Sequence, residues 1–149
     1  MGKRITVAVD GSPASELSLG HAIEQTRQHD AVLTGVFVID GQWADFIGND
    51  WQSSKGARQG FLDYILQEQE AQAQLAQDQF RQATVDCPNA HFEVLAGDPI
   101  DMLVQRASSA STDLLITSRR VFQVSGRPSL KGLAGQLTKR ASCPLLLLP

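Results

Sequence analysis

Five short apolar segments alternate with segments of helical periodicity along this chain of 149 residues. The apolar segments are Ile5–Val9, Ala31–Ile39, His91–Ala96, Asp113–Thr117 and Cys143–Leu148. Strands that are separated by helices must be joined by crossovers, so they run parallel, with helices packed on both faces. The sequence therefore predicts a single doubly wound α/β domain over residues 1–149, built on a five-stranded parallel sheet.

Local signals place the helices. Ser12 before Pro13 is a typical helix start, and apolar spacing predicts a helix over 13–29. Asp98 before Pro99 predicts a second start of the same kind. A long helix is predicted over 61–84, with its many glutamines on a solvated face, and a last helix over 131–141.

The segment 40–60 is predicted to be an irregular connection, and it carries both tryptophans, Trp43 and Trp51. A connection of this length in a small domain is usually functional or mobile. We expect the two rings to fold back over an apolar edge. Stacking on a base or forming a partner surface are the alternatives, and the role of the segment stays open at this stage.

Composition excludes several classes of protein. The apolar share of 42% and the charged share of 19% are those of a globular chain. A net charge of −3 argues against nucleic-acid binding, because no basic surplus exists to neutralise phosphates. No apolar run is long enough to span a membrane or to act as a signal peptide, so a cytoplasmic location is expected. Cys87 and Cys143 are then expected to be buried or half-buried thiols.

The segment 113–136 carries the main functional question. It runs from an apolar strand through Thr117 and Ser118 to two arginines, then through a loop containing Gly, Ser and Pro, into a helix. In open α/β sheets, ligands bind beyond the carboxyl ends of the strands, where the strand order reverses, and phosphates bind at helix N-termini. This loop is therefore the predicted ligand-binding edge.

Four stretches together resemble the universal stress protein family: VAVDGSPAS at 7–15, AGDP at 96–99, DLLITSR at 113–119 and GQLTKRASCPLLLL at 135–148. The resemblance covers essentially the whole chain, in order. It implies a Rossmann-like domain similar to the adenine nucleotide alpha hydrolases, and a homodimer formed through the last strand, Cys143–Leu148. Pro144 and the leucines fit such a strand, although a plain sheet edge would look the same.

Nucleotide-binding members of this family carry a pattern similar to Gly-x2-Gly-x9-Gly-Ser/Thr after the fourth strand. Here Thr117 stands at the first glycine and Arg120 at the second, with 14 residues instead of nine before Gly135. Gln136 replaces the hydroxyl residue. A different gap puts Gly126 at the second glycine, with eight residues before Gly135. Neither alignment restores the motif, and side chains occupy sites where backbone must approach phosphate closely.

The resemblance supplies candidate nucleotide-binding residues, each with a structural alternative. Asp10 would contact ribose or the phosphate–metal region, or else cap the next helix. Val38 would offer backbone groups to an adenine edge, or else only pack in the core. Arg119 and Arg120 would pair with phosphate, or else be solvated loop residues. Thr117, Gly126, Gly135 and Gln136 complete the set.

No catalytic or metal-binding set is expected. His21, His29 and His91 are eight or more residues apart and follow no metal-ligand pattern. The sequence also lacks a nucleophile elbow and paired catalytic carboxylates. Any enzymatic activity is expected to be weak ATP hydrolysis at most.

Two functions follow from these observations. The first is a stress-response regulatory or interaction protein that acts as a homodimer with an unidentified protein partner, without obligatory ATP binding and without nucleic acid or membrane. The second is a switch that binds ATP, with Mg²⁺, or AMP through a rebuilt 117–136 loop. No cofactor is required by the first function.

Overall fold

A computed structural model describes residues 3–49, 51, 55–108, 110–122, 127, 130 and 132–149. The strands are β1 (Arg4–Ala8), β2 (Val32–Asp40), β3 (Ala90–Gly97), β4 (Leu114–Ser118) and β5 (Leu145–Leu148). The helices are α1 (Pro13–His29), α2 (Trp43–Ile47), α3 (Lys55–Ala83), α4 (Pro99–Arg106) and α5 (Leu133–Arg140). This order confirms the predicted alternation of strands and helices.

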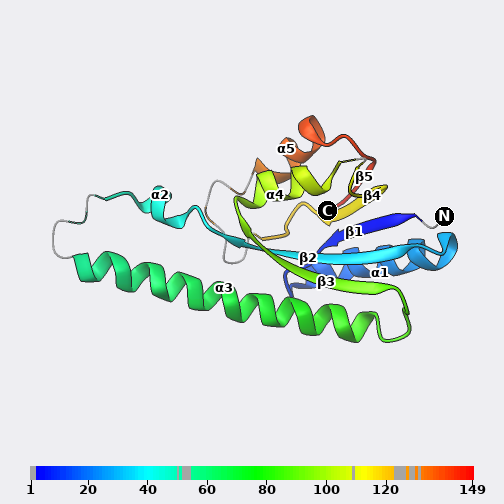
Figure 1. Cartoon of the computed structure of the whole chain (residues 1–149), viewed down its shortest axis with the longest axis horizontal. Helices are drawn as coiled ribbons and strands as arrows, with labels where there is room; N and C mark the ends of the chain where they lie inside the picture. The colour runs from blue at the N-terminus through cyan, green and yellow to red at the C-terminus, as the bar shows by residue number, and fades with distance from the viewer. Residues whose placement is uncertain are drawn as a thin grey trace.

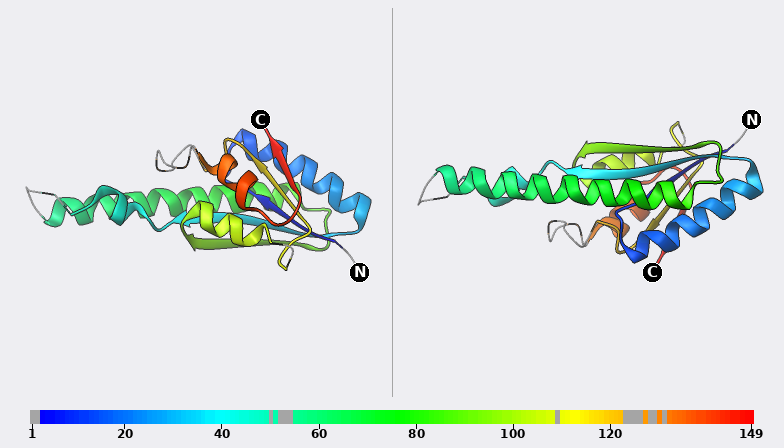
Figure 2. Two further views of the ribbon diagram at one scale, coloured as in Figure 1. Left: turned by 90° about the horizontal axis from the view of Figure 1, so that it is seen from above. Right: turned by 90° about the horizontal axis from the view of Figure 1, so that it is seen from below.

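The strands form one parallel sheet in the order β3-β2-β1-β4-β5. Helices α1 and α3 cover one face, and α4 and α5 cover the other (Figures 1 and 2). The chain winds outward from β1 to β3 and then returns to the other side of β1 with β4. The strand order therefore reverses between β1 and β4, and this is the predicted doubly wound fold with its switch point.

The predicted helix starts are confirmed. The Ser12 hydroxyl accepts a hydrogen bond from the Ser15 N–H at 3.3 Å at the start of α1. The Asp98 carboxylate accepts one from the Ile100 N–H at 2.9 Å at the start of α4. In both cases proline follows the cap. The N–H of the first helical residue has no partner within the helix, so proline, which lacks an N–H, costs no hydrogen bond there.

The prediction of an irregular segment over 40–60 is wrong in part. Helix α2 lies within it, and α3 begins at Lys55, upstream of the predicted start at 61. The guanidinium of Arg58 links the start of α3 to the end of α2, because its Nε donates to the Gly48 carbonyl at 2.8 Å. Helix α2 and the first turns of α3 extend beyond the end of the sheet (Figure 1).

The two tryptophans pack on this extension, away from the switch point. The ring centroids of Trp43 and Phe61 lie 6.2 Å apart, and those of Trp51 and Phe61 lie 5.9 Å apart. Trp43 also meets Phe46 edge-on, with centroids 5.6 Å apart. The expectation that these rings fold onto an apolar surface of the chain is confirmed, and α3 supplies that surface.

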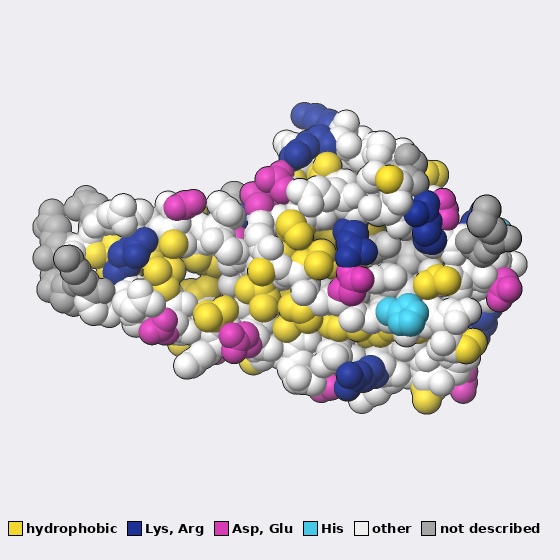
Figure 3. Space-filling view, in the orientation of Figure 1, with side chains coloured by type: hydrophobic (Ala, Val, Ile, Leu, Met, Phe, Trp, Pro, Cys, Tyr) yellow, Lys and Arg dark blue, Asp and Glu magenta, His cyan; other side chains and the backbone are white. Residues whose placement is uncertain are grey.

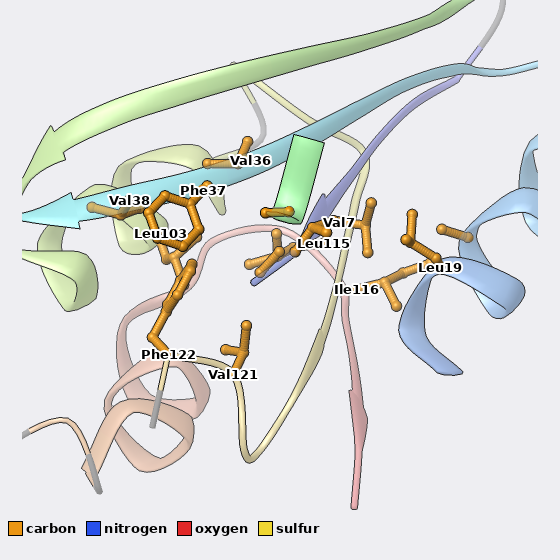
Figure 4. Packing of buried hydrophobic residues seen from close by; sticks show 14 of the residues in the cluster. Val7, Leu19, Val36, Phe37, Val38, Leu103, Leu115, Ile116, Val121 and Phe122 are labelled. Atoms are coloured by element: carbon orange, nitrogen blue, oxygen red, sulfur yellow. The ribbon is translucent and has the colours of Figure 1, made fainter. Parts of the chain in front are cut away.

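The core lies between the sheet and its two helix layers, and Figure 4 shows part of it. Val7, Leu115 and Ile116 are wholly buried on β1 and β4, and Leu19 of α1 lies beside Ile116. Strand β5 lies at one edge of the sheet, as Pro144 before it indicated. Within the described ranges no helix is both long and apolar enough to cross a membrane.

Candidate functional site

The carboxyl ends of β1 and β4 flank the switch point, and Asp10 follows β1 there. Its side chain is only 2% exposed. One carboxylate oxygen, Oδ1, accepts from the Ser12 N–H at 3.0 Å. The other, Oδ2, accepts from the Phe122 N–H at 2.9 Å. Asp10 therefore fixes the turn before α1 and, at the same time, holds the loop that follows β4.

Phe122 carries that loop across the end of β1 toward β2. Its ring is 6% exposed and meets the Phe37 ring of β2 edge-on, with centroids 5.5 Å apart (Figure 4). The preceding residue, Val121, is wholly buried. The backbone of Phe122 has a φ of 63°, a conformation that costs energy for a residue with a side chain. The structure thus places an apolar ring at the predicted ligand-binding edge.

A second buried carboxylate, that of Asp40 at the end of β2, holds the same loop further along. Asp40 is 5% exposed, and its Oδ2 lies 2.5 Å from Nε of Arg127. Its Oδ1 accepts from the Gln42 N–H at 2.9 Å. The Arg127 side chain is itself 10% exposed. This ion pair lies out of bulk water and links the β4–α5 loop to β2. We call Arg119–Phe122 and Arg127 together the crossing loop.

Three glutamines of α3 satisfy backbone groups at the same edge, and the prediction that the glutamines form a solvated face is wrong for them. Gln69 accepts from the Asp40 N–H at 2.5 Å and donates to the Asp40 carbonyl at 3.1 Å. Gln79 accepts from the Gly11 N–H at 3.1 Å and donates to the Ser12 carbonyl at 2.9 Å. Gln72 donates to the Asp10 carbonyl. The Gly11 N–H, which a phosphate could otherwise use, is therefore occupied.

The other predicted residues are placed as follows. Val38 and Thr117 are buried, at 2% and 1% exposure, and Val38 belongs to the core. Arg119 and Arg120 are exposed. Gly135 is exposed and Gln136 half-buried on α5. Gly126 lies outside the described residues.

Sequence reasoning missed six residues of this edge. Four of them owe their roles to contacts of α3 with the ends of β1 and β2, which no local pattern encodes; they are Asp40, Gln69, Gln72 and Gln79. Val121 and Phe122 form an apolar pair in an otherwise polar loop. That pair was the available signal, because apolar side chains in a loop commonly cover a core.

The inner lining of the edge is acidic, with Asp10 and Asp40 facing inward and Arg127 as the buried cation. Two carboxylates against one guanidinium disfavour an additional anion such as phosphate. Arg119 and Arg120, two further cations of the crossing loop, are exposed.

Comparison with known proteins gives the family context for this geometry. A match to the universal stress protein family spans residues 1–149. A universal stress protein of Methanocaldococcus jannaschii is 24% identical over 145 residues, covering 97% of this chain and 81% of that protein.

Two solved structures extend the comparison. The universal stress protein UspA of Lactobacillus plantarum superposes with a TM-score of 0.73 at 22% identity, covering 99% of this chain and 97% of that one. The universal stress protein of Archaeoglobus fulgidus in complex with dAMP superposes with a TM-score of 0.66 at 16% identity, covering 99% and 98% of the two chains.

Proposed function

Because the chain belongs to the universal stress protein family, we propose that it is a regulatory or interaction protein of the stress response that works without bound ATP. The observation that carries this proposal is the crossing loop. The Phe122 N–H is bound to the Asp10 carboxylate, and the Phe122 ring lies against Phe37, at the edge where this fold binds ligands.

The energetics favour the closed arrangement. A nucleotide entering here would have to displace a buried aromatic ring and leave the Asp10 carboxylate to find new donors. Exposing a Phe side chain alone costs roughly 1.5–3 kcal/mol. The acidic lining formed by Asp10 and Asp40 adds an electrostatic penalty for phosphate.

The proposal includes a homodimer through β5. The Leu115 N–H donates to the Pro144 carbonyl, and the Arg119 N–H donates to the Leu148 carbonyl. Residues 144, 146 and 148 therefore face β4, and Leu145 and Leu147 direct their backbone groups to the outer edge. An apolar edge without charges, half-buried along its length, suits pairing with the same strand of a second copy.

A second candidate function, an adenine-nucleotide switch, is favoured by one observation. The relative from Archaeoglobus fulgidus was solved with dAMP. In this function the exposed Arg119 and Arg120 would bind phosphate, and the loop that holds Phe122 would have to leave the end of β1 to admit the nucleotide.

Thermal unfolding with ATP, AMP and Mg²⁺ separates the two functions. A ligand that binds only the folded state must raise Tm. Because the crossing loop closes the site, we expect no shift in Tm at roughly 5 mM nucleotide. Phe122→Gly removes the ring, and glycine tolerates the positive φ at this position. This variant therefore tests whether the Phe122 ring keeps nucleotide out. A shift in the wild-type protein that Arg120→Ala abolishes would establish the switch instead.

Sedimentation velocity tests the dimer. Leu147→Pro removes an N–H that faces away from β4, so the fold is expected to survive while the dimer becomes a monomer. Leu147→Thr keeps that N–H and is the matched control. A wild-type chain that sediments as a monomer at all concentrations would disprove the homodimer.

A further inference from the structure

The opposite edge of the sheet, formed by β3, presents a row of backbone groups without partners among the described residues. The Leu33 N–H donates to the Asn89 carbonyl, and the Gly41 N–H donates to the Gly97 carbonyl. Residues 89, 91, 93, 95 and 97 therefore face β2. The N–H and C=O groups of the alternate residues point away from the sheet; these residues are Ala90, Phe92, Val94 and Ala96.

This edge carries none of the usual protections against strand addition. Natural edges are shortened, bulged, covered, or broken by proline or lysine. Strand β3 is eight residues long, pairs with β2 in an unbroken register, and contains neither proline nor lysine. Its one carboxylate, Glu93, is paired with Arg106 of α4. Val94 is 47% exposed at the middle of the edge.

A hollow of about 320 Å³ lies beside the first half of this edge, between β3 and α3. The rings of Phe80 and Phe92, with centroids 5.5 Å apart, form its apolar part. Gln77, Arg81 and His91 also line it, and no carboxylate does. Hydrophobic side chains continue along the boundary of β3 and α3 on the face that Figure 3 shows.

The charge of the hollow indicates an acidic occupant. Arg81 is exposed and has no carboxylate partner in the part of the chain that the structure describes. The Glu93 carboxylate lies on the side of α4, as its pairing with Arg106 shows. His91 shares its face of β3 with Glu93, whereas Arg81 comes from α3, so the guanidinium of Arg81 is the cation that an acidic side chain entering the hollow would meet.

A second copy of this chain is the less suitable occupant, an argument that rests on the proposed dimer through β5. If β5 pairs two copies, both ends of the resulting sheet are β3 edges. Pairing β3 with β3 would then join dimer to dimer without closure and build an open filament. A single strand from another protein ends the sheet.

We propose that β3 is a docking edge for an extended acidic segment of a partner protein. The segment adds as a sixth strand through the outward groups of Phe92 and Val94, and one of its carboxylates binds beside Arg81. Backbone hydrogen bonds supply the affinity, and the hollow selects the side chain. The β3 edge would then be the surface that binds the partner protein of the proposed function.

The test uses the full chain and a fluorescent seven-residue peptide in which valine and threonine alternate around one central glutamate. Fluorescence anisotropy is expected to show saturable binding. Replacing the glutamate of the peptide by glutamine, or Arg81→Gln in the protein, weakens binding roughly two- to fivefold, as expected for an exposed ion pair. The weakening disappears at high salt.

The backbone contribution is tested separately. Val94→Pro removes an outward N–H and no bond to β2, and is expected to weaken binding by about tenfold, whereas Val94→Thr binds as the wild type does. Circular dichroism verifies that each variant is folded. If Val94→Pro does not fold, Arg81→Gln still tests the proposal.

Three results would overturn the proposal. The first is no saturation up to roughly 1 mM peptide, a concentration at which even weak complexes form. The second is binding that neither variant alters. The third is self-association of the wild type that Val94→Pro abolishes and Leu147→Pro leaves intact, which would make the occupant a second copy. Loss of the β5 dimer alone leaves peptide binding unchanged, so the two proposals fail separately.

Discussion

The backbone N–H of Phe122 donates to Oδ2 of Asp10 over 2.9 Å, joining the loop after β4 to the end of β1. The same carboxylate accepts from Ser12 through Oδ1. Both donors and the acceptor are buried. One side chain thus determines the path of two loops at the switch point, and its removal should be costly.

We expect Asp10→Ala to lower the free energy of unfolding by about 2–4 kcal/mol, because two buried N–H groups lose their acceptor. Urea denaturation followed by circular dichroism measures the change. Asp86→Ala, at an exposed position, is the matched control and should have little effect. Equal stability of Asp10→Ala and the wild type would show that the loop has another anchor.

Gln69→Leu should destabilise the chain by about 2–3 kcal/mol, although leucine is a good helix former. Gln69 is 6% exposed, and its amide bonds both the N–H and the C=O of Asp40, which would be left buried without partners. Gln74→Leu on the same helix removes only an exposed bond to Asp78 and is the control. Thermal unfolding of the two variants side by side makes the comparison, and similar Tm values would contradict it.

The sequence predicted the order of strands and helices because each of those signals is local. Ser12 and Asp98 cap helices through bonds to residues two or three positions away. The contacts of Gln69 with Asp40 and of Phe122 with Asp10 span 29 and 112 positions. Such contacts exist only after the sheet has brought its strand ends together. The sequence therefore predicted the fold and its switch point, whereas the buried contacts of Asp10, Gln69 and Phe122 at that edge lay beyond any local pattern.

Gly35→Ala should be strongly destabilising, by about 2 kcal/mol or more. A Cβ at this position would lie 2.6 Å from Cε1 of Phe80, so this ring, which is 2% exposed, would have to shift. Gly60 on α3 has open space around its Cα, so Gly60→Ala should instead stabilise the chain by roughly 0.5–1 kcal/mol. Urea denaturation measures both, and an unchanged midpoint for Gly35→Ala would mean that the Phe80 ring adapts.

The pair of Arg4 and Asp113 predicts a small dependence of stability on pH. The guanidinium of Arg4 donates to both oxygens of Asp113, at 3.2 and 3.3 Å, and this lowers the pKa of the Asp113 carboxyl. Because the pKa of Asp113 is lower in the folded chain than in the unfolded chain, the pair stabilises the fold. This stabilisation is fully present at pH values above the unfolded pKa, near 3.9, and is lost as the pH falls through the folded pKa.

Asp113→Asn should therefore have a lower Tm than the wild type at pH 7, and the difference should vanish at about pH 2. The effect should be small and should shrink with added salt, because both side chains are exposed. Differential scanning calorimetry across this pH range follows it. A difference that persists at acid pH would mean that the pair is not its source.

The two thiols should differ in reactivity. Burial raises the pKa of the Cys143 thiol, and the residue is 8% exposed, whereas Cys87 is only half-buried. Because the thiolate is the nucleophile, iodoacetamide at pH 8 should alkylate Cys87 at least about tenfold faster than Cys143. Intact-mass spectrometry should show one adduct on the native chain and two in denaturant. Cys87→Ser is the control, and its native form should stay unlabelled; rapid labelling of that variant would show that β5 and the turn before it open readily.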